Sequence, residues 1–211
     1  MQDQAYFVSP ATGPGPGVLL LSSWWGLTPS VRRRADVLSD RGFSVLAPDL
    51  ALGEVPVDEA DAERILGESD PNRLASLVVT SAVLLAKKSK SGPGGGVIGF
   101  GMGGSMGLWL SVRQPELVSA AVSFYGSQAI DFAGAVARYQ IHLAAEDRFI
   151  SNDEAAFMEA TMGLELLEVE VIRHPGTEHG FADEESSSYL ASAAEEGWSR
   201  AVRFLGEVLV G

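Results

Sequence analysis

The sequence predicts a largely parallel β-sheet covered by α-helices on both faces. Short apolar runs of strand length alternate with amphipathic segments of helical length, which is the pattern of α/β proteins with parallel strands. The chain has 211 residues, of which 46% are hydrophobic, and this is enough to bury both faces of one sheet. No internal repeat is present. We therefore expect residues 1–211 to form a single α/β domain.

The first elements are predicted from the residues that begin and end them. Residues 18–22 form an apolar run of strand length. Residues 29–41 carry apolar side chains at helical spacing, with Pro29 suited to a first turn and Gly42 to the helix end. Residues 43–47 predict the next strand, which Pro48 closes.

A long amphipathic helix is predicted over residues 71–88. Its apolar side comprises Leu74, Leu77, Val78, Ser81, Leu84 and Leu85. Residues 89–96 are rich in Gly, Ser and Pro, and we interpret them as a loop and not as a domain linker.

The second half continues the alternation. Strands are predicted over residues 97–100, 120–125, 140–144 and 167–174, and helices over residues 103–113, 152–162 and 186–210. Functional sites of parallel sheets lie beyond the carboxyl ends of the strands. Four residues follow predicted strand ends and are expected to meet at one edge: Ser23, Gly101, Asp147 and His179.

Composition excludes several classes of partner and site. The chain has 28 acidic and 15 basic residues, a formal net charge of −13, and such a field repels nucleic acid and anionic membranes. It has no Cys, which excludes disulfides and thiolate sites. No apolar run approaches the roughly 20 residues of a membrane span, and the polar residues 1–4 do not begin a secretory leader. We expect a cytoplasmic protein without nucleic-acid or membrane partners.

The turn after residues 97–100 has the form of a nucleophile elbow. In an elbow of the form G-x-Nuc-x-G, a strand-to-helix turn lifts a Ser or Cys side chain above the sheet. Here residues 99–103 read GFGMG, so the central residue is Gly101. Because glycine has no side chain, the usual covalent route is closed at this residue.

Segments spread over nearly the whole chain resemble the dienelactone hydrolase family. They are residues 21–27 (LSSWWGL), 47–50 (APDL), 98–104 (IGFGMGG), 145–147 (AED) and 179–181 (HGF). The resemblance implies a three-layer α/β-hydrolase fold, with a mostly parallel sheet of about seven or eight strands. It also implies hydrolysis of a small ester or lactone without a cofactor, by a monomer or homodimer.

The resemblance implies roles for individual residues. His179 and Asp147 fall at the family's catalytic His and Asp, in which the carboxylate fixes the imidazole tautomer. The backbone amides of Trp24 and Met102 fall at the oxyanion hole. The expected substrate-pocket residues are Ser23, Trp25 and Phe181.

Three positions depart from the family pattern. The nucleophile, Cys or Ser in the family, is Gly101, and a Glu thought to control the thiol is Ser23. These changes belong together, because such a carboxylate has no task once the thiol is absent. An Arg that holds a substrate carboxylate one turn after the His is Asp183, so an anionic dienelactone is a poor candidate substrate.

Three functions therefore stay open. The chain could hydrolyse an ester or lactone by direct attack of water, catalyse a non-hydrolytic reaction (isomerase, cyclase or lyase) with His179 as the base, or bind a small molecule without catalysis. The intact pair of Asp147 and His179 favours an enzyme, whereas the changes at Ser23 and Gly101 favour the last two functions.

Other residues have simpler interpretations. Ser22, Ser23 or Ser105 could replace the nucleophile, but Ser105 is more simply a small packing residue. The glycines at positions 99, 101 and 104 match a dinucleotide fingerprint, yet the next strand lacks the carboxylate that holds a ribose.

The remaining histidines and tryptophans are expected to be structural. His142 is expected in the core and His174 at the border of the pocket, while Trp109 and Trp198 are expected in the core. No His and carboxylate spacing indicates a metal site.

Overall fold

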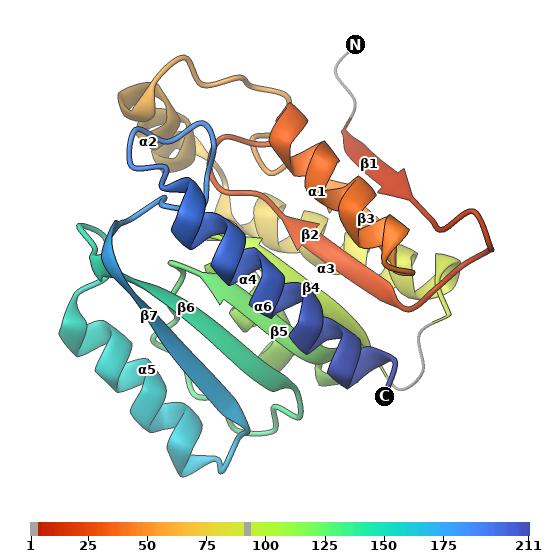
Figure 1. The fold of residues 1–211 in the computed structure, drawn as a ribbon. Helices are drawn as coiled ribbons and strands as arrows, with labels where there is room; N and C mark the ends of the chain where they lie inside the picture. The colour runs from red at the N-terminus through yellow and green to blue at the C-terminus, as the bar shows by residue number, and fades with distance from the viewer. Residues whose placement is uncertain (1–3, 91–93) are drawn as a thin grey trace.

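One sheet with strand order β1-β3-β2-β4-β5-β6-β7 forms the centre of the molecule (Figure 1). The computed structural model describes residues 4–90 and 94–211. The strands are β1 (Ala5–Val8), β2 (Gly17–Leu21), β3 (Ser44–Pro48), β4 (Gly95–Phe100), β5 (Val118–Phe124), β6 (Arg138–Glu146) and β7 (Val169–Glu178). Only β1 is antiparallel to its neighbour, and the other neighbouring strands are parallel.

Helices cover both faces of this sheet. They are α1 (Pro29–Asp40), α2 (Glu59–Glu68), α3 (Pro71–Lys88), α4 (Met102–Arg113), α5 (Asn152–Leu164) and α6 (Ala191–Leu209), with a 3-10 turn η1 (Pro115–Leu117). Helices α1 and α6 lie over the face turned toward the viewer in Figure 1, and α3, α4 and α5 pack on the other face.

Side chains of each strand alternate between the two helix layers. Val18 and Leu20 of β2 pack with α1 and α6, whereas Leu19 and Leu21 pack with α3 and α4. This alternation follows from the period of two in a β-strand, and it explains why β2 is apolar throughout. The expected arrangement of a mostly parallel sheet between two helical layers is confirmed.

The structure corrects several expected boundaries and adds two elements. The edge strand β1 and the helix α2 were not predicted, β7 continues to Glu178, and α6 begins only at Ala191. Leu84, expected on the apolar side of α3, is 42% exposed. Residues 1–3 of the expected polar start and residues 91–93 of the expected loop lie outside the described residues.

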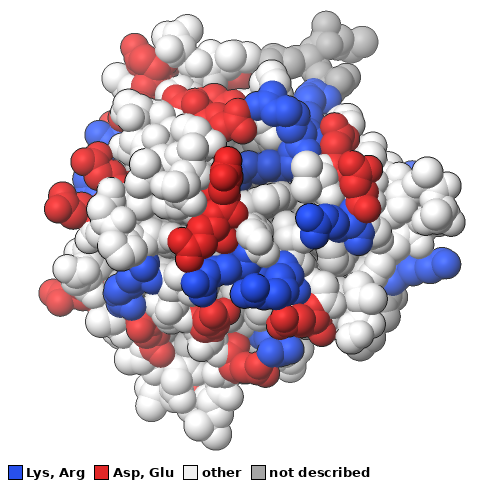
Figure 2. All heavy atoms as spheres, in the orientation of Figure 1, with Lys and Arg blue, Asp and Glu red and all other residues white. Residues whose placement is uncertain are grey.

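The surface and the helices also bear on possible partners. No helix in the described ranges combines the length and apolar character that a membrane crossing requires. Acidic and basic side chains are interspersed over the face seen in Figure 2, so neither sign of charge dominates that face.

Candidate active site

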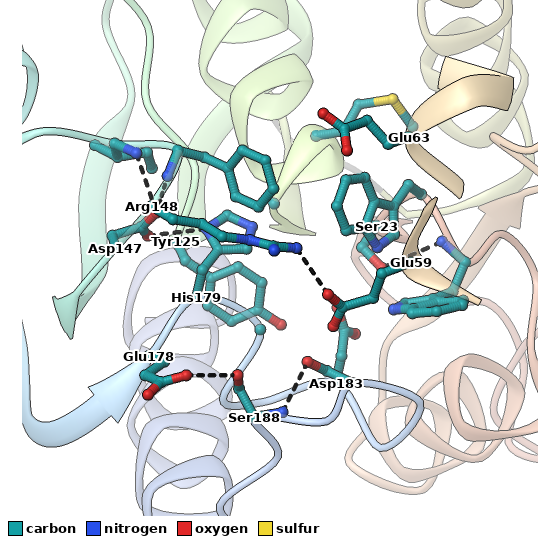
Figure 3. A pocket seen from close by; sticks show the side chains of 18 of the residues that line it. Ser23, Glu59, Glu63, Tyr125, Asp147, Arg148, Glu178, His179, Asp183 and Ser188 are labelled. Atoms are coloured by element: carbon teal, nitrogen blue, oxygen red, sulfur yellow. Dashed lines mark hydrogen bonds and ion pairs between the residues drawn. The ribbon is translucent and has the colours of Figure 1, made fainter. Parts of the chain in front are cut away.

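A cavity of about 800 Å³ opens at the carboxyl ends of the parallel strands. It is lined by the segments that follow β2, β4, β5, β6 and β7 and by residues of α2 (Figure 3). The structure brings seven of the expected site residues to the lining of this cavity: Ser23, Trp24, Trp25, Gly101, Met102, Asp147 and His179. The site therefore forms where parallel strands end, as their common direction requires.

His179 and Asp147 form a hydrogen-bonded pair on one wall of the cavity. His179 Nδ1 lies 2.9 Å from both carboxylate oxygens of Asp147. Asp147 Oδ1 also accepts hydrogen bonds from the backbone amides of Phe149 at 2.9 Å and Ile150 at 3.0 Å. Because Nδ1 donates to the carboxylate, the neutral ring keeps its lone pair on Nε2, which is the arrangement of a general base.

Gly101 lies directly in front of this base. A Cβ atom at position 101 would stand 3.5 Å from His179 Nε2, 3.7 Å from Ser23 Cβ and 3.8 Å from Tyr125 Cδ2. These are ordinary van der Waals distances, so the space for a side chain is present. The backbone of Gly101 has φ 51° and ψ −117°, a sharp turn between β4 and α4 of the kind that an elbow requires.

The glycines around position 101 are required by close backbone packing. A Cβ atom would stand 2.2 Å from the Gly103 carbonyl oxygen if placed on Gly99, and 2.3 Å from the Ser22 carbonyl oxygen if placed on Gly103. On Gly104 it would stand 2.6 Å from Ser123 Oγ. Gly101 differs from these three, because its surroundings leave space for a side chain, although its φ of 51° would strain any residue other than glycine.

Two backbone amides of the cavity are suited to bind an oxyanion. Met102 is the first residue of α4, where the amide has no acceptor within the helix. Trp24 lies in the turn after β2, and within the described ranges neither amide donates a hydrogen bond. Asp49 holds that turn, since its carboxylate accepts hydrogen bonds from Leu27 N at 3.2 Å and Gly53 N at 2.9 Å.

Aromatic side chains form the apolar part of the wall. Phe149 packs edge-on against the His179 ring with centroids 4.7 Å apart, and Trp24 packs against Phe149 at 5.3 Å. Phe149 was not predicted as a site residue, although it follows Asp147 by two residues. Phe181 was expected to line the substrate pocket, but it does not. It is fully buried and packs against the Tyr125 ring, with centroids 5.3 Å apart, beneath the residues that line the cavity.

Two further polar residues at the cavity were not expected in the site. Tyr125 is 1% exposed and its Oη has no hydrogen-bond partner among the described residues. Asp183 is 8% exposed and lies beside Ser23 and Tyr125. Burial raises the pKa of Asp183, against a smaller lowering by the Arg34 guanidinium. The sequence did contain a signal for Asp183, because this carboxylate stands at the position where the family carries a substrate-binding Arg.

The candidate serine nucleophiles have different surroundings. Ser105 lines the cavity, and its Oγ accepts a hydrogen bond from Ser127 N at 3.1 Å, so its role extends beyond helix packing. Ser23 lines the cavity beside Gly101. Ser22 is 1% exposed and is absent from the lining.

The other two histidines belong to the core. His142 Nδ1 lies 2.9 Å from His174 Nε2, and His142 Nε2 lies 3.0 Å from Gln140 Oε1. His142 is fully buried, as expected, but His174 is 3% exposed and does not border the cavity. Within residues 4–90 and 94–211, no group of three or more His, Asp or Glu side chains is arranged to hold a metal ion.

Acidic side chains dominate the charge of the cavity. Six line it, namely Glu59, Glu63, Glu146, Asp147, Glu178 and Asp183. Arg148 is the basic side chain of the described lining, and it forms an ion pair with Glu59 at 2.7 Å across the mouth (Figure 3). No basic residue of the lining is thus left to bind an anionic substrate.

Known proteins are similar to this chain over nearly its whole length. The model of the dienelactone hydrolase family matches residues 4–209. "Protein usf" of Aquifex pyrophilus is 28% identical over 217 residues, which cover 98% of this chain and 94% of that protein. A protein of Aquifex aeolicus, provisionally named a carboxymethylenebutenolidase, is 30% identical over 202 residues, covering 90% of this chain and 87% of its own length.

Solved structures show the same fold. A dienelactone hydrolase-like promiscuous phosphotriesterase from metagenomic libraries superposes with a TM-score of 0.82 at 22% identity, covering 97% of this chain and 92% of that one. The described chain therefore has the three-layer α/β-hydrolase fold that the sequence resemblance implied.

Proposed function

Because this chain belongs to the dienelactone hydrolase family, we propose that it hydrolyses a small uncharged ester or lactone by direct attack of water. The observation that supports this most is the empty side-chain position at Gly101, 3.5 Å from His179 Nε2. A water molecule in that space is within reach of the base. No acyl-enzyme forms at position 101.

The reaction follows from the positions of these groups. His179 Nε2 removes a proton from the water, and Asp147 stabilises the imidazolium that results. The oxygen of the water bonds to the acyl carbon, and the amides of Trp24 and Met102 stabilise the oxyanion. The bond to the leaving oxygen then breaks and that oxygen takes up a proton, which yields an acid and an alcohol.

The charge of the cavity supports the substrate class. With six acidic residues and Arg148 already paired to Glu59, a substrate carboxylate meets repulsion that nothing nearby offsets. We expect kcat/KM for a neutral ester to exceed that for its carboxylate-bearing analogue by at least about tenfold, which corresponds to about 1.4 kcal/mol.

The direct test is a panel of aryl esters and lactones assayed with wild type, His179→Ala and Asp147→Asn. Each substitution is expected to lower kcat by about 10²–10⁴-fold, since the first removes the base and the second its orienting partner. Asp153→Asn, on the exposed first turn of α5, is the matched control and should retain full activity.

Mass spectrometry during turnover tests the direct route. We expect no covalent adduct. A stable acyl group on Ser23, Ser105 or any other residue would contradict the direct attack of water. If the acyl group lay on Ser23, loss of activity in Ser23→Ala would identify that residue as the nucleophile.

A second candidate function is favoured by the same space at Gly101. With no nucleophile in front of His179, the base can reach a proton on a substrate carbon, as an isomerase or lyase requires. Failure of the wild type on every ester and lactone, together with conversion of a ketone or enol substrate that His179→Ala abolishes, would favour this function.

A further inference from the structure

Asp183 places a buried carboxyl group in the wall of the cavity without a counterion. It is 8% exposed, and in the described part of the chain no basic side chain forms an ion pair with it. A buried carboxylate without a paired charge is costly, so such groups keep their proton instead.

Burial sets the direction of the pKa shift of Asp183, against the opposing charge of Arg34. Burial raises the pKa of Asp183 most, the Arg34 charge of α1 and the neighbouring Ser23 hydroxyl lower it, and the Glu185 charge raises it. Arg34 is itself engaged elsewhere. Its guanidinium donates to the carbonyl of Ala182 and lies over the Phe100 ring, 4.4 Å from the centroid.

Tyr125 adds an unpartnered hydroxyl next to this carboxyl group. Its Oη is buried without a hydrogen-bond partner among the described residues, and the residue lines the cavity. Burial, and next the Asp183 charge, raise the pKa of Tyr125 well above its usual value. The phenol therefore keeps its proton and can donate. Its backbone has φ 38°, a conformation that non-glycine residues adopt mainly where the surroundings enforce it.

The Tyr125 hydroxyl and Asp183 lie away from Asp147, the carboxylate partner of the base. In Figure 3 the Tyr125 hydroxyl points away from Asp147 and toward the side where Asp183 and Ser23 lie. The Tyr125 ring itself contacts the His179 ring, with centroids 5.0 Å apart. The Tyr125 ring therefore links the base to the side of the cavity where Asp183 lies.

We propose that Asp183 and Tyr125 form the acid half of the site and protonate or hydrogen-bond the leaving oxygen of the substrate. This role rests on the proposed hydrolysis. His179 takes one proton from water as the oxygen of that water bonds to the acyl carbon. Asp183 gives its proton to the oxygen whose bond to that carbon breaks, and the imidazolium returns a proton to Asp183 through water. The sum is one ester and one water consumed, one acid and one alcohol formed.

Leaving-group dependence tests this role within one folded variant. An alkyl alcohol is a poor leaving group and needs the proton, whereas 4-nitrophenolate leaves without one. We expect Asp183→Asn to lower kcat about 100-fold on an alkyl ester and less than about threefold on the 4-nitrophenyl ester of the same acid. Tyr125→Phe should show a smaller loss of the same kind. Glu184→Gln, the exposed neighbour paired with Arg33, is the matched control.

A second measurement does not depend on activity. In protein labelled with ¹³C at the Asp carboxyl groups, the signal that disappears in Asp183→Asn should still report a protonated carboxyl at neutral pH. An ionised carboxyl at neutral pH would overturn the acid role, as would equal losses of kcat on the two esters. If the wild type cleaves neither ester, the proposed hydrolysis fails and the titration alone decides whether Asp183 is an acid.

Discussion

At position 101 the backbone turns as an elbow does, but the side chain is absent. The turn has φ 51°, and an added Cβ would make only ordinary contacts with His179, Ser23 and Tyr125. The absence of a side chain is therefore not imposed by packing. In the proposed mechanism it leaves the space in which water meets the base.

Restoring a nucleophile should change the chemistry, since the space for a side chain is present, although φ 51° strains any residue other than glycine at this position. In Gly101→Cys the sulfur is expected within reach of His179 Nε2, since the Cβ position is 3.5 Å from that atom. An acyl-enzyme should then form and appear by mass spectrometry as a mass increase on residue 101. Gly101→Ala, which fills the same space without a nucleophile, is expected to lose activity by about 10²-fold or more, because it excludes the water.

The outcome in wild type separates the functions. Ester cleavage in wild type that Gly101→Ala removes supports direct attack of water. Cleavage found only in Gly101→Cys would mean that the natural protein binds its ligand without hydrolysing it.

The junction of β4 and α4 is the element that positions the site. Its glycines allow the first turn of α4 to approach β2 so closely that a Cβ on Gly103 would stand 2.3 Å from the Ser22 carbonyl oxygen. This approach brings the Met102 amide and the turn at Trp24 to the same cavity.

A matched pair of alanine substitutions tests this packing. Gly103→Ala is expected to cost about 3 kcal/mol or more of unfolding free energy, because backbone atoms cannot move aside as side chains do. Gly206→Ala, in α6 with no atom within 4 Å of the added Cβ, should instead gain about 0.5–1 kcal/mol from helix propensity. Urea unfolding measures both, and equal effects of the two substitutions would contradict the argument.

The elements also show where prediction from the sequence worked. Helix α3 was predicted from its amphipathic pattern and the start of α1 from Pro29, and the structure begins α3 at Pro71 and α1 at Pro29. The helix α2 was missed, although it forms one wall of the cavity through Glu59 and Glu63. Its sequence, EADAERILGE, buries only Ala62 and Ile65, so its apolar pattern is weak.

Across the whole molecule, stability should depend on two buried histidines. Burial, and next the charge of His174, lower the pKa of His142 to about 3, and burial also lowers the pKa of His174. Burial of both rings, His142 on β6 and His174 on β7, therefore favours their neutral forms in the folded protein.

Acid should therefore destabilise the fold. Below the ordinary histidine pKa of 6.5, the unfolded chain binds protons that the folded chain does not. Unfolding free energy then falls as pH decreases from about 6.5 to about 3, by about 1.4 kcal/mol per pH unit for each proton. His142→Gln should be less stable than wild type near pH 8, since it loses the stacking on Phe124 at 4.2 Å, but should show a shallower acid slope in urea titrations. Equal slopes would contradict the assignment.

Some properties of this protein follow from its sequence alone. The alternation of apolar runs and helical segments determines the layers, because each element must bury its apolar side. The positions of Gly101, Asp147 and His179 directly after strands β4, β6 and β7 determine where the site lies. These are local patterns that repeat along the chain. Which side chains share the cavity depends on contacts between residues far apart in sequence, and only the tertiary structure decided these. It moved Phe181 and His174 into the core, and it brought Tyr125 and Asp183 to the cavity wall, because burial depends on the summed packing of every neighbouring element.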